Sequence, residues 1–321
     1  MARRELGPAA LRVARAVAAM LPPGPVVVGC SGGADSTALA LGARWAAGRA
    51  GTRMSAVVID HGLQPGSRTV AEATVARLAA RGVDAAAVTV TVDPVHDGGL
   101  EAAAREARLA ALAAPGHEVL LGHTLDDQAE TVLMGMLRGS GTRSLAGMAP
   151  VRGPFMRPLL GLRRADTEQA CREWGIEVWA DPMNEDPRFA RVRTRALLRE
   201  LTSAMGRDVA PSLARTATLA RADADLLDDL ARAAVAVADE LPIDELEVLP
   251  DALRSRVVHR WLRARSPEAG MVHVRDVMAL VVRWRGQGAV AVPGGRVSRR
   301  SGTLVFSGPR GTGAAEPAAA R

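Results

Sequence analysis

The sequence predicts an α/β protein with a doubly wound parallel sheet and a smaller, mainly helical C-terminal domain. Over the first half of the chain, short β-branched runs alternate with helical segments, which is typical of parallel sheets. After about residue 210, long Ala- and Leu-rich helical segments replace this alternation. A chain of 321 residues is long enough for two domains. We expect domains at 1–200 and 201–307, the second with a terminal β-hairpin, and a disordered tail at 308–321.

The first strand leads into a turn of small residues. Val26–Val28 is an apolar β-branched run, and an apolar-periodic helix follows the turn. Strand, glycine turn and helix together present backbone N–H groups and a helix N-terminus to a phosphate. The turn has no Lys after its glycines and is not Gly-x-Gly-x-x-Gly, so neither standard nucleotide loop fits. An ordinary α/β turn is the alternative. The candidate nucleotide-binding residues are Ser31, Gly32, Gly33, Ala34, Asp35 and Ser36.

The next elements continue the alternation. We expect strands at 54–60, 86–92 and 118–121, with helices at 70–80 and around 101–108 between them. Asp60 and His61 end the second strand, where a parallel sheet places residues that contact ligands. A structural histidine is the alternative for His61. These two residues are therefore candidates for nucleotide binding.

A second polar segment, residues 123–131, begins at the end of the fourth strand and continues into a helix. Asp127 and Glu130 are three positions apart and share a helical face. Asp126 lies near the helix start, where a carboxylate can cap the helix or hold Mg²⁺. An acidic N-cap is the alternative, but two Asp and one Glu at the carboxyl edge of a sheet favour a functional site.

An arginine-dense segment follows at 188–199. Arg191 and Arg195 share a helical face with few acidic neighbours, which favours contact with phosphate over a solvated surface. We expect a further helix at 164–174 in the first domain. The expected elements of the second domain are helices at 211–236, 250–264 and 273–284 and a hairpin formed by 287–292 and 302–306.

The composition restricts the function classes. The sequence contains no Lys, so all 41 basic residues are Arg, and the net charge of +6 favours a polyanionic partner. A coding bias towards Arg is the simpler cause of the arginine content. The two cysteines, Cys30 and Cys171, provide neither a disulfide framework nor a metal cluster. No apolar run reaches membrane-spanning length, so we expect a cytoplasmic protein without membrane association.

Along most of residues 25–200 the chain resembles the tRNA(Ile)-lysidine synthase family of PP-loop (N-type) ATP pyrophosphatases. The first matching motif, Ser-Gly-Gly-Ala-Asp-Ser, is specific only to the superfamily, whereas the later motifs in this order are more specific. The matching segments are 31–36, 60–63, 101–108, 122–131, 138–141 and 157–160. One position departs from the family pattern, since Val192 stands where the family has Asn. The resemblance implies an adenine nucleotide α-hydrolase-like fold.

The resemblance also implies a reaction. The wobble cytidine of isoleucine tRNA with a CAU anticodon would be adenylated by ATP, and free L-lysine would then displace AMP to give lysidine. Residues 1–200 would be catalytic and 201–307 would contact tRNA. Mg²⁺ is expected near Asp35 or Asp127. The candidate catalytic residues are Asp35, Arg105, Asp127, Glu130 and Arg195. The oligomeric state stays open and includes a homodimer.

Three other functions remain open at this point. A tRNA thiolase of the same superfamily commonly needs a Cys-x-x-Cys pair, which this chain lacks. An amidotransferase-type synthetase that makes GMP or NAD would explain the first loop but not the arginines at 188–199. A non-enzymatic ATP- or RNA-binding module would bind nucleotide without releasing pyrophosphate.

Overall fold

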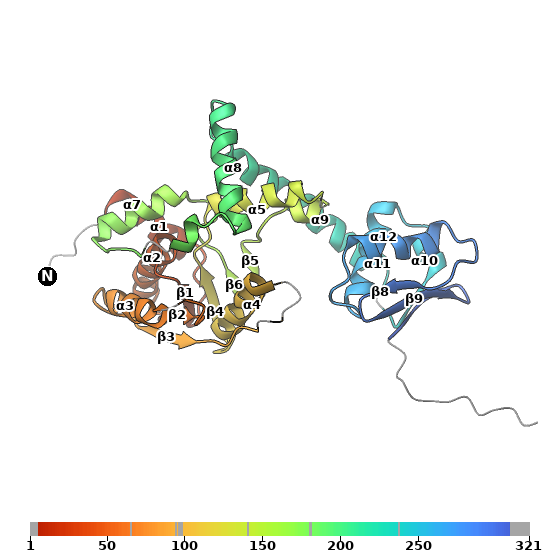
Figure 1. Ribbon diagram of the computed structural model, residues 1–321, viewed down its shortest axis with the longest axis horizontal. Coiled ribbons are helices and arrows are strands. Elements are labelled where there is room, and N and C mark those ends of the chain that lie inside the picture. Colours follow the sequence, from red (N-terminus) through yellow and green to blue (C-terminus); the bar gives the residue numbers. More distant parts are fainter. Residues whose placement is uncertain are drawn as a thin grey trace, which may run out of the picture. The chain divides into compact units, whose positions relative to one another are not determined.

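The computed structural model describes residues 6–64, 66–93, 95, 99–139, 141–179, 182–236 and 238–308. The chain forms two compact units, Met1–Arg221 and Ala222–Arg321, each described by itself below (Figure 1). The expected boundary after residue 200 stays a prediction. Apart from residue 308, the expected C-terminal tail lies outside the described residues.

The first unit is built around a six-stranded sheet in the order β3-β2-β1-β4-β6-β5. Its strands are β1 (Val26–Cys30), β2 (Met54–Asp60), β3 (Ala85–Thr89), β4 (Glu118–Leu121), β5 (Val151–Arg152) and β6 (Phe155–Met156). All neighbouring strands are parallel except β5 and β6. The predicted parallel α/β class is thus confirmed, and the last two strands, β5 and β6, form an antiparallel hairpin.

Helices cover both faces of this sheet. Because successive side chains of a strand point to opposite faces, Val26 and Val28 pack with one set of helices and Val27 with another. The first set is α1 (Pro8–Ala18), α2 (Ala34–Ala50), α3 (Ser67–Ala79) and α7 (Arg164–Trp174), and α4 (Gly99–Ala113) lies on the opposite face. The sheet is therefore doubly wound, as predicted.

The strand order reverses between β1 and β4. In open parallel sheets, ligands bind beyond the carboxyl ends of the strands at such a point. The 31–36 turn follows β1, and α5 (Leu125–Leu137) follows β4. The remaining elements of this unit are α6 (Thr142–Leu145), the 3₁₀ helix η1 (Pro182–Glu185), α8 (Ala190–Ala204) and the first part of α9 (Ala210–Ala234). Leu133 of α5 packs against Leu198 of α8, which carries the arginine-dense segment to the same edge of the sheet.

The second unit combines helices with a four-stranded antiparallel sheet in the order β7-β10-β9-β8. Its elements are β7 (Glu240–Pro242), α10 (Ile243–Glu247), α11 (Asp251–Arg263), α12 (Met271–Val282), β8 (Val290–Val292), β9 (Gly295–Arg300) and β10 (Thr303–Ser307). Trp261 is fully buried in its core. No helix in the described parts of either unit is long and apolar enough to span a bilayer.

The terminal hairpin differs from the expected one. The sequence suggested that 287–292 pairs with 302–306, but β8 pairs with β9, and β9 then pairs with β10. Both Gly294 and Gly302 have positive φ, so each allows a tight turn at its position. Two turns therefore produce three consecutive antiparallel strands, and β7 completes the sheet from a segment with no clear strand pattern.

Candidate active site

The 31–36 turn is held together by its own polar groups. The Ser36 hydroxyl accepts a hydrogen bond from the Ser31 N–H and donates one to the Gly33 carbonyl, each at 3.1 Å. Gly32 has a φ of +87°, and a Cβ at this position would lie 2.7 Å from Oγ1 of Thr74 on α3. Only glycine fits both constraints. Gly33 then caps α2, so the turn ends at a helix N-terminus.

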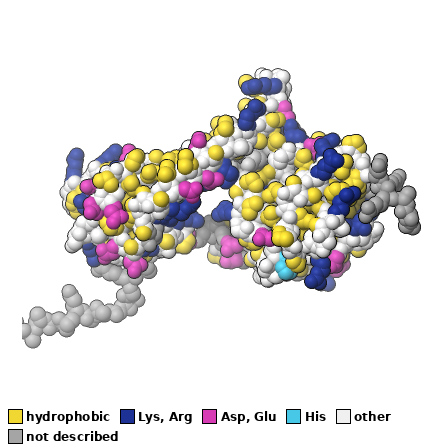
Figure 2. Space-filling model, turned by 180° about the vertical axis from the view of Figure 1, so that it is seen from behind, with side chains coloured by type: hydrophobic (Ala, Val, Ile, Leu, Met, Phe, Trp, Pro, Cys, Tyr) yellow, Lys and Arg dark blue, Asp and Glu magenta, His cyan; other side chains and the backbone are white. Residues whose placement is uncertain are grey.

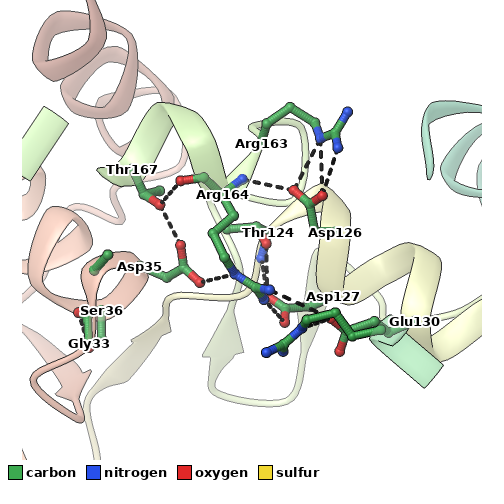
Figure 3. A network of polar contacts seen from close by, with 12 residues as sticks. Gly33, Asp35, Ser36, Thr124, Asp126, Asp127, Glu130, Arg163, Arg164 and Thr167 are labelled. Atoms are coloured by element: carbon green, nitrogen blue, oxygen red, sulfur yellow. Dashed lines mark hydrogen bonds and ion pairs between the residues drawn. The ribbon is translucent and has the colours of Figure 1, made fainter. Parts of the chain in front are cut away.

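Asp35, in the first turn of α2, is linked to the acidic start of α5 by an arginine from α7 (Figure 3). Arg164 places Nε 3.2 Å from Oδ2 of Asp35 and Nη2 2.8 Å from Oδ1 of Asp127. The Thr167 hydroxyl donates to the other oxygen of Asp35. The N-terminal turns of α2, α5 and α7 therefore meet at one cluster of charged side chains.

Asp127 serves both as a helix cap and as part of this cluster. Its Oδ2 accepts hydrogen bonds from the backbone N–H and the hydroxyl of Thr124, at 2.8 and 2.9 Å. Its Oδ1 faces Arg164. The neighbouring Asp126 points elsewhere and binds the Arg163 guanidinium through both oxygens. The two interpretations of this acidic segment, cap and site, thus apply to different oxygens of one side chain.

Glu130 lies one turn further along α5 and is only 1% exposed. Its Oε1 accepts a hydrogen bond from Arg195 Nε at 2.9 Å and lies 3.7 Å from Arg164 Nη1. Its Oε2 is 3.9 Å from Arg191 Nη1 and accepts no hydrogen bond from the described residues. A buried carboxylate with one oxygen unbonded is costly unless a ligand bonds to it.

Burial and charge shift the pKa values of this cluster in opposite directions. Burial raises the pKa of Asp35 to about 6, because it outweighs the attraction of Arg164 and the Thr167 hydrogen bond. Burial also opposes the charge of Arg164, but Asp127, Asp35 and Glu130 together hold its pKa above the usual value. Arg164 therefore stays charged, whereas the pKa of Asp35 lies only slightly below neutral pH.

A group of cationic and imidazole side chains lies on the other side of the same sheet edge. Burial, followed by the charges of Arg105 and Arg191, lowers the pKa of Arg108 to about 10. Burial also lowers the pKa of His123 to about 3, with Asp127 opposing the shift and several arginines adding to it. Atoms of this group with no hydrogen-bond partner among the described residues are Arg108 Nε, His61 Nδ1, His123 Nδ1 and Arg157 Nε. Crowded positive charge with unused donors is suited to an anion.

The predicted residues separate into two sets. Asp35, Asp127, Glu130 and Arg195 meet in the Arg164 cluster. Arg105 instead lies on α4, where its charge acts on Arg108, His123 and Arg157.

The remaining candidates lie at the strand ends. Ser31 to Ser36 form the turn after β1, while Asp60 accepts a hydrogen bond from the Gly62 N–H at 3.0 Å. His61 lies beside it, and burial lowers its pKa.

Sequence reasoning missed Arg164 and Thr167. Both lie at the start of the expected helix at 164–174, in a segment whose arginines resemble ordinary surface residues. The only signal was their position shortly after the matching segment 157–160. Arg164 lies 37 positions from its partner Asp127, and Thr167 lies 132 positions from its partner Asp35. No local sequence pattern can therefore show these contacts.

The donor set at this cluster is suited to magnesium. No group of three potential metal-binding side chains is assembled in the described parts of the chain. Asp35 and Asp127 nevertheless direct one oxygen each at a single cation, the guanidinium of Arg164. Mg²⁺ prefers such carboxylate oxygens, together with water and substrate phosphates. The two residues therefore fit a magnesium ion that arrives with a polyphosphate.

The fold and site define a class of protein. A parallel α/β sheet with a Ser-Gly-Gly-x-Asp-Ser turn at the switch point is the architecture of the PP-loop domain, and residues 9–201 match the PP-loop domain family. Residues 241–305 match a second family, the TilS substrate binding domain. The chain belongs to the tRNA(Ile)-lysidine synthase family.

Curated relatives extend over nearly the whole chain. The tRNA(Ile)-lysidine synthase of Cutibacterium acnes is 50% identical over 96% of this chain and 99% of its own length. The proteins of the same name from Rhodococcus erythropolis and Mycobacterium tuberculosis are 48% and 49% identical, over 88% and 87% of this chain and 89% and 90% of theirs.

A solved structure supports the fold. The U34-tRNA thiolase NcsA from Methanococcus maripaludis superposes with a TM-score of 0.51 over 65% of this chain and 76% of that chain. The two sequences are 16% identical, so this likeness concerns the fold alone.

Proposed function

We infer that this chain uses ATP to form lysidine on tRNA(Ile), with release of AMP and pyrophosphate. The observation that carries this inference is the Arg164 cluster, because it joins the turn after β1 to the acidic helix after β4. A nucleotide at the turn and a second substrate at the acidic helix would then react at one place. Family membership and relatives of this name support the same activity.

In the first step, the 2-carbonyl oxygen of the wobble cytidine attacks the α-phosphorus of ATP. A phosphorus–oxygen bond forms to the base, and the bond to the β-phosphate breaks as pyrophosphate leaves. The turn 31–36 and the N-terminus of α2 would hold the pyrophosphate through backbone N–H groups. Arg105, in the cationic group on α4, is suited to neutralise charge on the phosphates. Mg²⁺ at Asp35 and Asp127 would supply further neutralisation.

In the second step, the ε-amine of free lysine attacks carbon 2 of the adenylated cytidine. A carbon–nitrogen bond forms, the carbon–oxygen bond to AMP breaks, and the amine loses a proton. Glu130 would hold the incoming ammonium group, because its Oε2 is buried and unbonded. Once the pyrophosphate has left with Mg²⁺, Oδ1 of Asp127 would orient the amine and accept its proton. Arg195 would position Glu130 through their hydrogen bond.

The tRNA must reach this site as an exposed loop. An anticodon loop already presents unstacked bases, so little distortion is required. Arginine side chains are exposed on each of the two units on the face shown in Figure 2, which fits contact with phosphates. We propose that the CAU anticodon selects the tRNA and that the second unit contributes to its binding. We also propose a cytoplasmic location, where ATP, lysine and tRNA occur together. We further propose that the protein forms a homodimer, which sedimentation of the full chain tests.

The experiment combines pyrophosphate release with the mass of the modified nucleoside. The full chain is incubated with ATP, lysine and Mg²⁺, and with either isoleucine tRNA bearing CAU or elongator methionine tRNA. We expect pyrophosphate release and a cytidine heavier by one lysine less water in the first tRNA only. Pyrophosphate release without lysine incorporation would contradict the assignment and would favour a thiolase or an amidotransferase-type synthetase instead.

A matched pair of variants tests the role of Glu130. Glu130→Gln keeps the shape of the side chain but removes its charge, so we expect the lysine concentration for half-maximal rate to rise by about tenfold or more. Glu72→Gln is the control, because Glu72 forms an exposed pair with Arg68 on α3. Equal lysine dependence in both variants would remove Glu130 from the lysine site.

The cysteines argue against sulfur transfer by this chain. Cys30 and Cys171 are both buried, and burial raises the pKa of each thiol, that of Cys171 to about 12. A thiol of this kind is a poor nucleophile at neutral pH.

A further inference from the structure

Arg164 holds a place in the active site that neither the sequence motifs nor the family resemblance assigned. Its guanidinium contacts three carboxylates on two helices: Nε faces Asp35 at 3.2 Å, Nη2 faces Asp127 at 2.8 Å, and Nη1 lies 3.7 Å from Glu130. These carboxylates would repel one another without a cation between them, and the charge of Asp127 does act unfavourably on ionised Asp35. One arginine thus balances the acidic half of the site.

The same oxygens are the ones that a divalent cation requires. Asp127 has only Oδ1 available, because Oδ2 caps α5 through Thr124. In Asp35, Oδ1 already accepts a hydrogen bond from the Thr167 hydroxyl, so apart from Arg164 its Oδ2 is the less engaged oxygen. Arg164 contacts both of these available oxygens. A divalent ion and the guanidinium cannot share them, because two positive charges a few ångströms apart repel strongly in a partly buried site.

We propose that Arg164 is a place-holding cation that occupies the divalent-metal position of the substrate-free site and leaves it when the metal–nucleotide complex binds. The proposal rests on the assignment of Asp35 and Asp127 as magnesium ligands under the proposed function. Arg164 is thus a positioning residue: it keeps the acidic cluster assembled and excludes free divalent ions until the phosphates of ATP supply the remaining ligands.

The local structure allows this movement. Arg164 is the first residue of α7, and its backbone N–H is fixed to Oδ2 of Asp126 at 2.8 Å. The side chain is 25% exposed, so it has a path to solvent. The guanidinium can therefore swing away while the helix start stays in place. Its charge is then available to the phosphates that enter with the metal.

The test measures binding of Mn²⁺, a spectroscopic substitute for Mg²⁺, to the full chain without ATP or tRNA. Free Mn²⁺ is counted by electron paramagnetic resonance. We expect Arg164→Gln to bind one Mn²⁺ about tenfold more tightly than the unmodified chain. The Mn²⁺ affinity of Arg164→Lys, which keeps the charge, should lie between those of the unmodified chain and Arg164→Gln. In Arg164→Gln, the further change Asp127→Asn should abolish the gain and so locate the ion.

Arg163→Gln is the matched control. It removes the same charge from the neighbouring position, but Arg163 pairs with Asp126 and Asp208 rather than with Asp35 or Asp127. We expect its Mn²⁺ affinity to equal that of the unmodified chain. If Arg163→Gln gains as much as Arg164→Gln, the effect is one of net charge and the proposal is wrong.

The remaining outcomes separate this proposal from the proposed function. Equilibrium dialysis with Mn²⁺ and ATP measures the metal retained with protein. If Arg164→Gln binds Mn²⁺ alone no better than the unmodified chain while both retain Mn²⁺ with ATP, Arg164 is a permanent structural contact and only the place-holding role fails. If neither protein retains Mn²⁺ with ATP, Asp35 and Asp127 are not metal ligands, and both proposals fail. Thermal unfolding without metal shows whether each variant is folded.

Discussion

Arg195 Nε and Glu130 Oε1 lie 2.9 Å apart although 65 positions separate them in the chain. This hydrogen bond joins α8 to α5 at the edge of the sheet where the 31–36 turn also lies. Glu130 is almost fully buried, whereas the Arg195 side chain is 31% exposed. The arginine thus lies between a buried carboxylate and solvent.

Loss of the Arg195 charge should destabilise the protein. Arg195→Ala leaves Glu130 with Arg164 and Arg191 at 3.7 and 3.9 Å only. Because removing one partner of a buried carboxylate is costly, we expect the free energy of unfolding to fall by about 1–3 kcal/mol. Urea unfolding followed by circular dichroism measures this change.

Arg188→Ala is the control for this prediction. Arg188 pairs with Asp186, but its side chain is 86% exposed. Exposed pairs contribute little, so we expect no measurable change in the urea midpoint. Equal losses of unfolding free energy in Arg195→Ala and Arg188→Ala would show that the Arg195–Glu130 hydrogen bond does not stabilise the protein more than an exposed pair.

Gly32 and Gly33 should respond differently to the same substitution. Gly32→Ala forces an L-residue into φ +87° and places Cβ 2.7 Å from Thr74 Oγ1, which is itself bonded to Val70 and Arg77. We expect a loss of about 1–3 kcal/mol in stability without ATP. A Cβ on Gly33 would be 3.8 Å from Ser31 Oγ, so Gly33→Ala should unfold near the temperature of the unmodified chain. Thermal unfolding measures both variants. Equal unfolding temperatures for Gly32→Ala and Gly33→Ala would show that Gly32 is not required by the turn.

His123 should make the protein sensitive to acid. Its pKa falls from the ordinary 6.5 to about 3 on folding, because burial disfavours the imidazolium form. The unfolded chain therefore binds a proton that the folded chain does not as pH falls below 6.5. Stability contributed by neutral His123 is complete above pH 6.5 and is lost progressively towards pH 3.

The corresponding measurement is urea unfolding at pH 7 and pH 5. We expect the unmodified chain to lose about 2 kcal/mol more than His123→Asn over this interval, because one extra proton binds the unfolded chain. Parallel losses in the two proteins would show that His123 is protonated in the folded state as well.

Trp261 allows a test of packing in the second unit. Its side chain is fully buried, and Nε1 has no hydrogen-bond partner among the described residues. Trp261→Ala should cost about 3–5 kcal/mol through the cavity it leaves. Trp261→Phe should cost less than about 1.5 kcal/mol, because it keeps most of the volume and removes an unsatisfied donor. Chemical unfolding of the full chain gives both values, and equal costs would contradict the prediction that side-chain volume dominates at this position.

Much of the fold follows from local patterns. The strand at 118–121 and the helix at 164–174 match the expected bounds, because a short apolar run and a clear helical period mark them. The terminal sheet does not follow in this way. Several turns there are compatible with the sequence, and the observed pairing is the one that buries Val292, Val297 and Leu304 in the core with Trp261.

Part of the site also follows from the sequence. The positions of Ser31 to Ser36, Asp127 and Glu130 at the ends of β1 and β4 were predictable, because parallel strands bring their carboxyl ends to one edge. Arg105, a candidate catalytic residue by resemblance, lies on α4, where its charge acts on Arg108, His123 and Arg157. The helical periodicity of the sequence predicts the face of the helix on which a residue lies. It does not predict which of two neighbouring clusters a long side chain reaches.

The sequence by itself determined the class of the fold, the turn at 31–36 and the acidic helix, since each rests on residues close together in the chain. Only the tertiary structure decided that Arg164 links Asp35 to Asp127 and Glu130. These contacts join residues that are 34 to 129 positions apart. They depend on how three helix N-termini are brought together around one sheet edge, and no local pattern contains that information.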